Sequence, residues 1–177
     1  PLQRVQCATQ KEFIKEQRIR SNKTLYEHDI NPVFRCLEEN YLGKETPKLN
    51  VMFFDIEVDF DPDRGYSTTD DPFMPITAIS CYMSWTDQLV TFAVPPKTIS
   101  MDDAKELTKR FDNTMLFEKE KDMLDAFLEL VQDADILSGW NSEGYDIPYT
   151  VGRIQKVLSS DDTSRLCFWG QKHRKRI

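Results

Sequence analysis

Residues 51–60, VMFFDIEVDF, constrain the fold of this chain more than any other stretch. The run is dense in Val, Phe and Ile, which predicts a strand over residues 50–58 in the interior of a sheet. Asp55 and Glu57 interrupt it, and their spacing puts both side chains on one face, about 6 to 7 Å apart at the backbone. Two carboxylates in a partly buried strand are costly unless something positive lies between them.

Helical and strand patterns alternate through the rest of the chain, which predicts an α/β domain. We expect helices near residues 9–18, 32–43, 100–110, 120–132 and 146–158. Further strands are expected near residues 76–85, 89–94, 114–117 and 135–140, and a polar loop at 59–75. A boundary near Thr46 and Pro47 separates an N-terminal segment, 1–48, from the main domain, 49–177, whose basic tail at 170–177 is expected to be loose.

The composition indicates a globular protein, with 40% hydrophobic and 30% charged residues. No apolar run approaches the ~18 residues of a membrane helix, and no secretory signal is visible, so we expect a cytoplasmic protein without a membrane partner. Four dispersed cysteines favour reduced, mostly buried thiols over a zinc site or disulfides. The net charge of −7 argues against a broadly basic nucleic-acid surface, but not against an acidic, cation-holding site that acts on nucleic acid.

The paired carboxylates allow two interpretations. Oxygen ligands without His or Cys nearby favour Mg²⁺ or Mn²⁺, which would explain Asp55 and Glu57 in an apolar strand. Alternatively, in a chain with 30 acidic residues such a pair arises by chance and faces water at a strand end.

A second stretch, SGWNSEGYDIPY at 138–149, lies at a predicted strand-to-helix junction. In one interpretation Asp146 caps the helix or pairs with its dipole, and Trp140 and Tyr149 pack in the core. In the other, Asn141 and Asp146 emerge at the C-terminal end of a strand beside the first one, where α/β folds commonly place their sites.

The two stretches together resemble a known family. FDIEV is similar to the first exonuclease motif of family B DNA polymerases, and GWNSEGYDIPY is similar to the second. LYEHDINPVFRCLEENYLG also looks like the lead-in that precedes their exonuclease domain, and the combination most resembles the T4-like bacteriophage branch. The resemblance implies a ribonuclease H-like fold, a mixed sheet with helices on its faces, and a proofreading 3′–5′ exonuclease.

The resemblance also implies roles for particular residues. Asp55, Glu57 and Asp146 would be the catalytic ligands of two Mg²⁺ or Mn²⁺ ions, with Asp55 bridging both. The ions would serve hydrolysis of the 3′-terminal phosphodiester of single-stranded or primer-template DNA. Substrate-binding roles are expected for four residues: Asn141 and Trp140 would shape the pocket, and Phe60 or Tyr145 could stack on a base.

The family's third exonuclease motif, a Tyr followed three residues later by a carboxylate, has no counterpart here. Asp161 and Asp162 follow no such Tyr, and the polymerase palm is absent. We therefore expect a polymerase fragment or one piece of a split polymerase, poorly active without the remaining chain or a companion subunit, and located in an infected bacterial cell. Two alternatives stay open: a catalytically inactive module that binds nucleic acid or a partner on the same scaffold, and an unrelated hydrolase such as a glycosidase that uses Asp55 and Glu57.

Overall fold

The computed structural model describes residues 3–173, apart from the side chain of Pro32. The chain divides into two compact units, Pro1–Pro47 and Lys48–Ile177. The predicted loose tail lies partly outside the described residues, at 174–177. No helix in the described part combines the length and apolar character needed to cross a membrane.

The first unit contains the two helices that its sequence predicts, α1 (Gln10–Ile19) and α2 (Pro32–Tyr41). Each begins at a polar cap: Glu12 N donates to Thr9 Oγ1 at 3.2 Å, and Val33 N donates to Asn31 Oδ1 at 2.9 Å. The apolar stripe of α2, which includes Val33, is exposed, and no residue of α1 is buried. Among the described side chains, these two helices therefore contribute no buried residue to a core.

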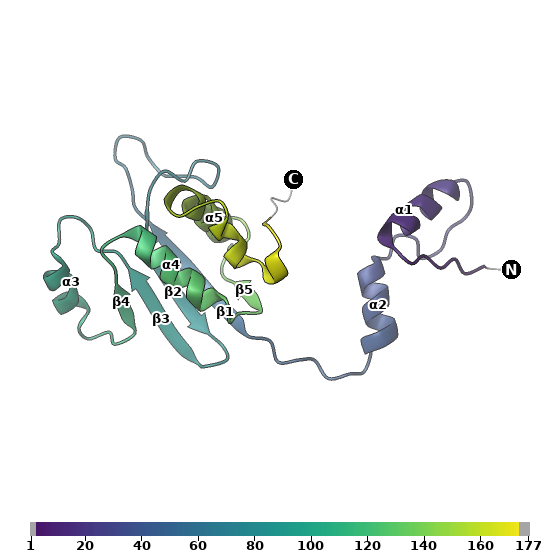
Figure 1. Cartoon of the computed structure of the whole chain (residues 1–177), viewed down its shortest axis with the longest axis horizontal. Helices are drawn as coiled ribbons and strands as arrows, with labels where there is room; N and C mark the ends of the chain where they lie inside the picture. The colour runs from purple at the N-terminus through teal and green to yellow at the C-terminus, as the bar shows by residue number, and fades with distance from the viewer. Residues whose placement is uncertain (1–2, 174–177) are drawn as a thin grey trace. The chain divides into compact units, whose positions relative to one another are not determined.

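The second unit is built on a five-stranded sheet in the order β4-β3-β2-β1-β5 (Figure 1). The strands are β1 (Val51–Val58), β2 (Ile76–Met83), β3 (Gln88–Ala93), β4 (Thr114–Leu116) and β5 (Ile136–Ser138). β1–β2 and β2–β3 are antiparallel, whereas β1–β5 and β3–β4 are parallel. The mixed sheet confirms the predicted α/β fold class, and β1 lies between two neighbours, as its apolar composition predicts.

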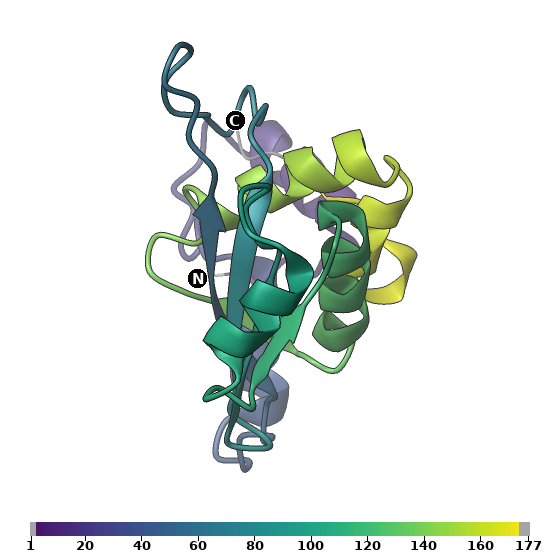
Figure 2. The ribbon, with the colours of Figure 1, turned by 90° about the vertical axis from the view of Figure 1, so that its left-hand side faces the viewer.

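Helices α4 (Glu120–Val131) and α5 (Asp146–Val157) lie on the same side of this sheet (Figure 2). Their apolar faces meet the inward side chains of β1, where the Phe54 and Phe127 rings lie 5.6 Å apart between centroids. The predicted apolar stripe of α4 is buried: Leu124, Phe127, Leu128 and Val131. A further helix, α3 (Met101–Thr108), begins at the predicted cap Ser100, whose hydroxyl accepts from Asp103 N at 3.1 Å.

The polar loop between β1 and β2 is fastened to α4 and α5 by a buried ion pair. Arg153 Nε donates to Glu120 Oε1 at 2.8 Å, and its Nη1 donates to the Pro72 carbonyl at 3.0 Å. Glu120 Oε1 also accepts from Ile76 N at 2.8 Å, at the start of β2. Tyr149 adds a hydrogen bond from its hydroxyl to a loop carbonyl. One ion pair thus connects two helices, the loop and a strand.

The segment after α5 forms two short 3₁₀ helices that the sequence did not predict, η1 (Asp162–Leu166) and η2 (Phe168–Gly170). Arg165 of η1 holds this segment against α4 through Asp125 at 2.6 Å and Glu129. All four cysteines are free, as expected. The expectation that they are mostly buried was wrong, because only Cys81 is buried and Cys36 is exposed.

Candidate active site

Asp55 and Glu57 lie on the face of β1 that the helices leave open. Burial alternates along the strand, so that Met52, Phe54 and Ile56 are buried whereas the two carboxylates are exposed. Both carboxylates therefore share one face, as the strand period predicts. The expectation that they are partly buried was wrong: α4 and α5 cover the other face of β1, so water can solvate both charges without a cation.

Asp146, the first residue of α5, is buried with 4% of its surface exposed. Its Oδ1 accepts a hydrogen bond from Ile56 N at 3.2 Å, between residues 90 positions apart. The β1–β5 ladder ends at Phe53 and Ser138, so Asp146 accepts from an N–H of β1 beyond the end of that ladder. The carboxylate thus accepts a hydrogen bond from a strand N–H, which differs from the helix-capping alternative, and the cap residue, Tyr145, makes no side-chain cap bond. The position of Asp146 in the first turn of α5 does agree with the alternative that it pairs with the helix dipole.

The surroundings of Asp146 act on its pKa in opposite directions. Desolvation by burial raises the pKa, whereas the hydrogen bonds from the backbone of Ile56 and from its own backbone lower it. The negative charge of Asp55 raises it further, and the net shift is upward. Asp55 on the open face and Asp146 at the ladder end are therefore close enough to repel each other.

The donor set agrees only in part with the expected metal ions. Carboxylate oxygens without His or Cys suit Mg²⁺ or Mn²⁺, and Asp55 and Glu57 are accessible. Within residues 3–173, however, no three His, Cys, Asp or Glu side chains are arranged so that they could hold a metal ion. One oxygen of Asp146 is engaged by Ile56 N. These three carboxylates by themselves do not form a closed metal site.

The turn between β5 and α5 carries two of the predicted substrate-binding residues. Trp140 is 92% exposed, so the alternative that places it in the core was wrong, although Tyr149 is fully buried as that alternative expects. Asn141 adopts a left-handed backbone conformation, φ 53°, which Asn tolerates better than most residues. Its carbonyl accepts from Gly144 N and Tyr145 N at 2.9 and 3.0 Å. The turn therefore presents Trp140 to solvent.

Tyr145 and Phe60, the two aromatic residues expected to stack on a base, differ in how far their rings are free to contact a ligand. The ring of Tyr145 stacks on Tyr149 with centroids 5.3 Å apart, so it is engaged within the domain. Phe60 instead pairs with Tyr66, at 4.9 Å between centroids, and Tyr66 is 84% exposed. A tight turn brings the pair together, since Gly65 N donates to the Asp61 carbonyl at 2.7 Å. Sequence reasoning missed Tyr66; the signal was two aromatics flanking the Asp-Pro-Asp-Arg-Gly turn.

A groove of about 380 Å³ begins beside Glu57 and was also missed from the sequence. Its floor follows the cross-strand row from Glu57 to Ala78 and Ala93, where small side chains leave room above the sheet. Pro95 and Leu107 contribute to its lining. The open face thus combines exposed carboxylates with an adjacent hollow.

The sequence of this chain is similar to those of known DNA polymerases. The family model described as "DNA polymerase family B, exonuclease domain" matches residues 4–177. The DNA-directed DNA polymerase of Escherichia phage RB69 is 31% identical over 147 residues, which cover 72% of this chain and 16% of that polymerase. The DNA polymerase catalytic subunit of Saimiriine herpesvirus 2 (strain 11) is 29% identical over 126 residues, covering 69% of this chain and 12% of that subunit.

The DNA-directed DNA polymerase of Enterobacteria phage T4 is 34% identical over 65 residues, which cover 36% of this chain and 7% of that polymerase. The chain therefore spans less than a fifth of the length of each of these curated relatives.

Proposed function

The chain belongs to the exonuclease domain family of the family B DNA polymerases, and on this basis we propose that it is the proofreading 3′–5′ exonuclease part of a phage-type polymerase. We assign residues 49–177 to the exonuclease domain and residues 1–48 to an N-terminal domain segment. The reaction is hydrolysis of the phosphodiester that carries the 3′-terminal nucleotide. The cytoplasm of an infected bacterial cell is the setting that fits the phage relatives.

The observation that carries this proposal is the hydrogen bond from Ile56 N to Asp146 Oδ1, which joins the two stretches that resemble exonuclease motifs beyond the end of the β1–β5 ladder. Asp55 and Glu57 project from the open face of β1, and Asp146 lies against the Ile56 N–H of the same strand. The charge of Asp55 acts on Asp146, so the two stretches that resemble exonuclease motifs are coupled in space. Exposed carboxylates beside an apolar groove suit a substrate whose phosphate binds to cations held by those carboxylates.

In this proposal Asp55, Glu57 and Asp146 are the catalytic carboxylates and metal ligands. The expected ions are Mg²⁺ or Mn²⁺, two in the complete site, where such ions activate the attacking water and stabilise the leaving oxygen. Because no preformed three-residue group exists within residues 3–173, further ligands are expected from the remainder of a polymerase chain or from a companion subunit. This chain supplies the carboxylate oxygens of Asp55 and Glu57, which are held on a rigid strand, and the buried hydrogen bond from Ile56 N that positions Asp146.

The substrate is expected to be a single-stranded or frayed primer 3′ end. The Phe60–Tyr66 pair offers exposed rings on which a base can stack, and the groove beside Glu57 offers room for the terminal nucleotide. Trp140 and Asn141 occupy the exposed turn next to Asp146 and would contact the neighbouring nucleotides. Tyr145 would act only through its stack with Tyr149.

Mn²⁺ binding tests the site without relying on activity. Calorimetric titration of the chain should detect weak Mn²⁺ binding that Asp55→Asn abolishes. Asp102→Asn is the matched control, because this exposed helical aspartate makes only a 3.8 Å ion pair with Lys105. Equal Mn²⁺ affinity of the wild type and Asp55→Asn would contradict the proposed ligands.

Nucleotide release tests the reaction itself. With Mg²⁺ and a labelled single strand, a full-length polymerase carrying this sequence should release terminal nucleotides and prefer mismatched to paired ends. Asp146→Ala should remove that activity. The isolated 177-residue chain is expected to be at least about a hundredfold slower, because elements of a catalytic unit act together. Internal cuts, or a preference for paired ends, would contradict proofreading.

A second candidate is a module that binds DNA or a partner without cleaving it. The missing three-residue metal group within residues 3–173 is the observation that favours it. Mn²⁺ binding and nucleotide release that both depend on Asp55 and Asp146 would exclude this candidate. Retained single-strand affinity with neither property would support it.

A further inference from the structure

The loop between β1 and β2, residues 59–75, consists of an exposed tip and a half that is fastened to α5. The fastened half, residues 67–75, contacts the helix through its backbone and side chains. Arg153 donates to the Pro72 carbonyl at 3.0 Å. Gly152 comes so near to the same proline that a Cβ on it would lie 2.5 Å from Pro72 Cγ. Residues 67–75 therefore have a fixed position against α5.

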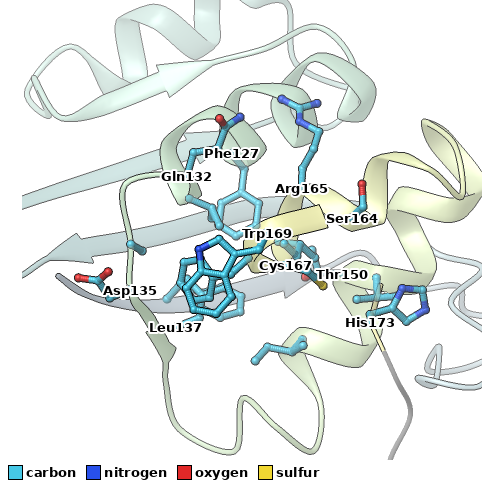
Figure 3. A pocket seen from close by; sticks show the side chains of 17 residues that line it. Phe127, Gln132, Asp135, Leu137, Thr150, Ser164, Arg165, Cys167, Trp169 and His173 are labelled. Atoms are coloured by element: carbon cyan, nitrogen blue, oxygen red, sulfur yellow. The ribbon is translucent and has the colours of Figure 1, made fainter. Parts of the chain in front are cut away.

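Helix α5 is a firm base for this half of the loop. Its Tyr149 is fully buried, and the hydroxyl of this residue donates to the Met74 carbonyl at 2.8 Å. The 3₁₀ helix η1 also contacts α5, and Thr150 of α5 lines a hollow together with Cys167 and Trp169 of the following segment (Figure 3). The fastened half is thus held by a helix that the core and the C-terminal segment fix in place.

Arg64 joins the tip, residues 59–66, to the fastened half. Its Nη2 donates to Asp71 Oδ2 at 2.5 Å, and its Cζ lies 3.7 Å from the centroid of the Phe73 ring. The side chain of Arg64 nevertheless remains 57% exposed. A guanidinium has five N–H donors, and the hydrogen bond to Asp71 uses one of its nitrogens. The structure therefore holds a partly exposed cation two residues from Tyr66.

The charges around Arg64 make it the favourable place for an anion on this loop. Residues 59–75 include five aspartates, and Arg64 is the one Lys or Arg among them. Asp71 is shared between two cations, because its Oδ1 lies 3.3 Å from Lys156 Nζ. The group of Arg64, Asp71 and Lys156 therefore carries a net charge of one positive unit. A phosphate near the tip is attracted by this group and repelled by the other aspartates.

We propose that Arg64 binds the backbone phosphate of the nucleotide whose base stacks on the Phe60–Tyr66 pair. The planar guanidinium suits two parallel hydrogen bonds to phosphate oxygens, and the contacts with Asp71 and Phe73 hold it in place before the strand arrives. A phosphate contact carries no sequence information, which suits the removal of any mispaired nucleotide. The contact rests on the proposed exonuclease function, whose single-stranded substrate it would hold.

Binding of a labelled oligothymidylate, followed by fluorescence anisotropy in EDTA, tests this contact without metal ions or cleavage. Arg64→Gln should weaken binding by about tenfold. It should also lower the slope of log affinity against log salt concentration by about 0.7, the value for one phosphate contact on a single strand. Arg64→Lys should keep the slope but bind more weakly than the wild type, because an ammonium cannot form the two parallel bonds.

Arg110→Gln is the matched control. Arg110 is also exposed and also lies over a ring, that of Phe111 at 4.7 Å, but it belongs to the segment after α3 rather than to the loop. Its replacement changes the net charge equally and should leave affinity and salt slope unchanged. An effect of Arg110→Gln as large as that of Arg64→Gln would overturn a specific contact at Arg64.

Asp71→Asn separates phosphate binding from mere fastening of the tip. This variant removes the carboxylate partner of Arg64 but keeps the guanidinium, and it deletes a negative charge. If Arg64 binds phosphate, Asp71→Asn should bind oligothymidylate at least as tightly as the wild type. Equal weakening by Asp71→Asn and Arg64→Gln would show that Arg64 only fastens the tip and would overturn the proposal. Unchanged affinity and salt slope in Arg64→Gln would overturn it as well.

Mn²⁺ titration distinguishes failure of this contact from failure of the proposed function. Arg64→Gln should bind Mn²⁺ like the wild type, because Arg64 is not among the proposed metal ligands. A wild type that binds Mn²⁺ through Asp55 but binds no oligothymidylate would overturn the phosphate contact and leave the metal ligands in place. Oligothymidylate binding that depends on Arg64, without any Mn²⁺ binding, would support the contact and contradict the metal ligands.

Discussion

Replacing Arg153 with methionine should destabilise the second unit strongly. Its guanidinium donates to both carboxylate oxygens of Glu120, at 2.8 and 2.5 Å, and to the carbonyls of Pro72 and Phe73. Methionine would fill much of the space, but it would leave the Glu120 charge, whose side chain is 10% exposed, with the N–H of Ile76 as its one remaining donor among residues 3–173. Breaking such a buried pair costs about 3–5 kcal/mol. That is a large share of the roughly 5–15 kcal/mol that stabilises a domain.

Urea unfolding followed by circular dichroism measures this loss. Lys109→Met is the control: its exposed pair with Glu106 spans 3.3 Å and is worth at most about 1 kcal/mol. Adding Glu120→Gln to Arg153→Met should recover part of the stability, because no unpaired charge remains while Ile76 N keeps an acceptor. A loss below about 1 kcal/mol in Arg153→Met, or no recovery in the double variant, would refute the reasoning about a buried, unpaired charge.

Three other predictions follow from single contacts. Burial raises the pKa of the Cys81 thiol to about 12. Iodoacetamide at neutral pH should therefore modify the exposed Cys36 rapidly and Cys81 only after unfolding, which mass spectrometry of the peptides would show. Gly139→Ala should lower the melting temperature markedly, because a Cβ there would overlap the backbone carbonyl of Phe54; an unchanged temperature would contradict this placement of β5. Tyr66→Ala should weaken oligothymidylate binding in a fluorescence anisotropy titration by about tenfold or more, the cost of one lost stacking contact, and an unchanged affinity would remove the Phe60–Tyr66 pair from the proposed DNA path.

The sequence predicts much of this fold because its signals are local. The period of β1 puts Asp55 and Glu57 on one face, and the apolar spacing of residues 120–132 gives the buried stripe of α4. The placement of β5 next to β1 was also correct, since a strand that leads into a helix commonly adds a parallel strand to such a sheet.

The exposure of the carboxylates could not be read from β1 alone. The strand has apolar residues on both faces, including Phe53, so its composition suggests burial on both sides. Whether α4 and α5 cover the odd-numbered or the even-numbered positions depends on tertiary packing. The structure leaves Phe53 47% exposed beside Tyr82, which identifies the uncovered face. Likewise, no local rule pairs Asp146 with an N–H 90 residues away.

Asp146 connects the covered side of the sheet to the open face. It begins α5, whose buried residues Tyr149 and Ile154 fix the helix against the core, so its carboxylate is held by packing that Asp55 and Glu57 do not share. Asp146 can accept from Ile56 N because the β1–β5 ladder stops at Phe53 and Ser138, so β5 offers no carbonyl to that N–H. A longer β5 pairing would satisfy Ile56 N with a strand carbonyl and would leave Asp146 buried without that donor. The short fifth strand is therefore what allows a carboxylate from the helix layer to reach the strand that carries the other two.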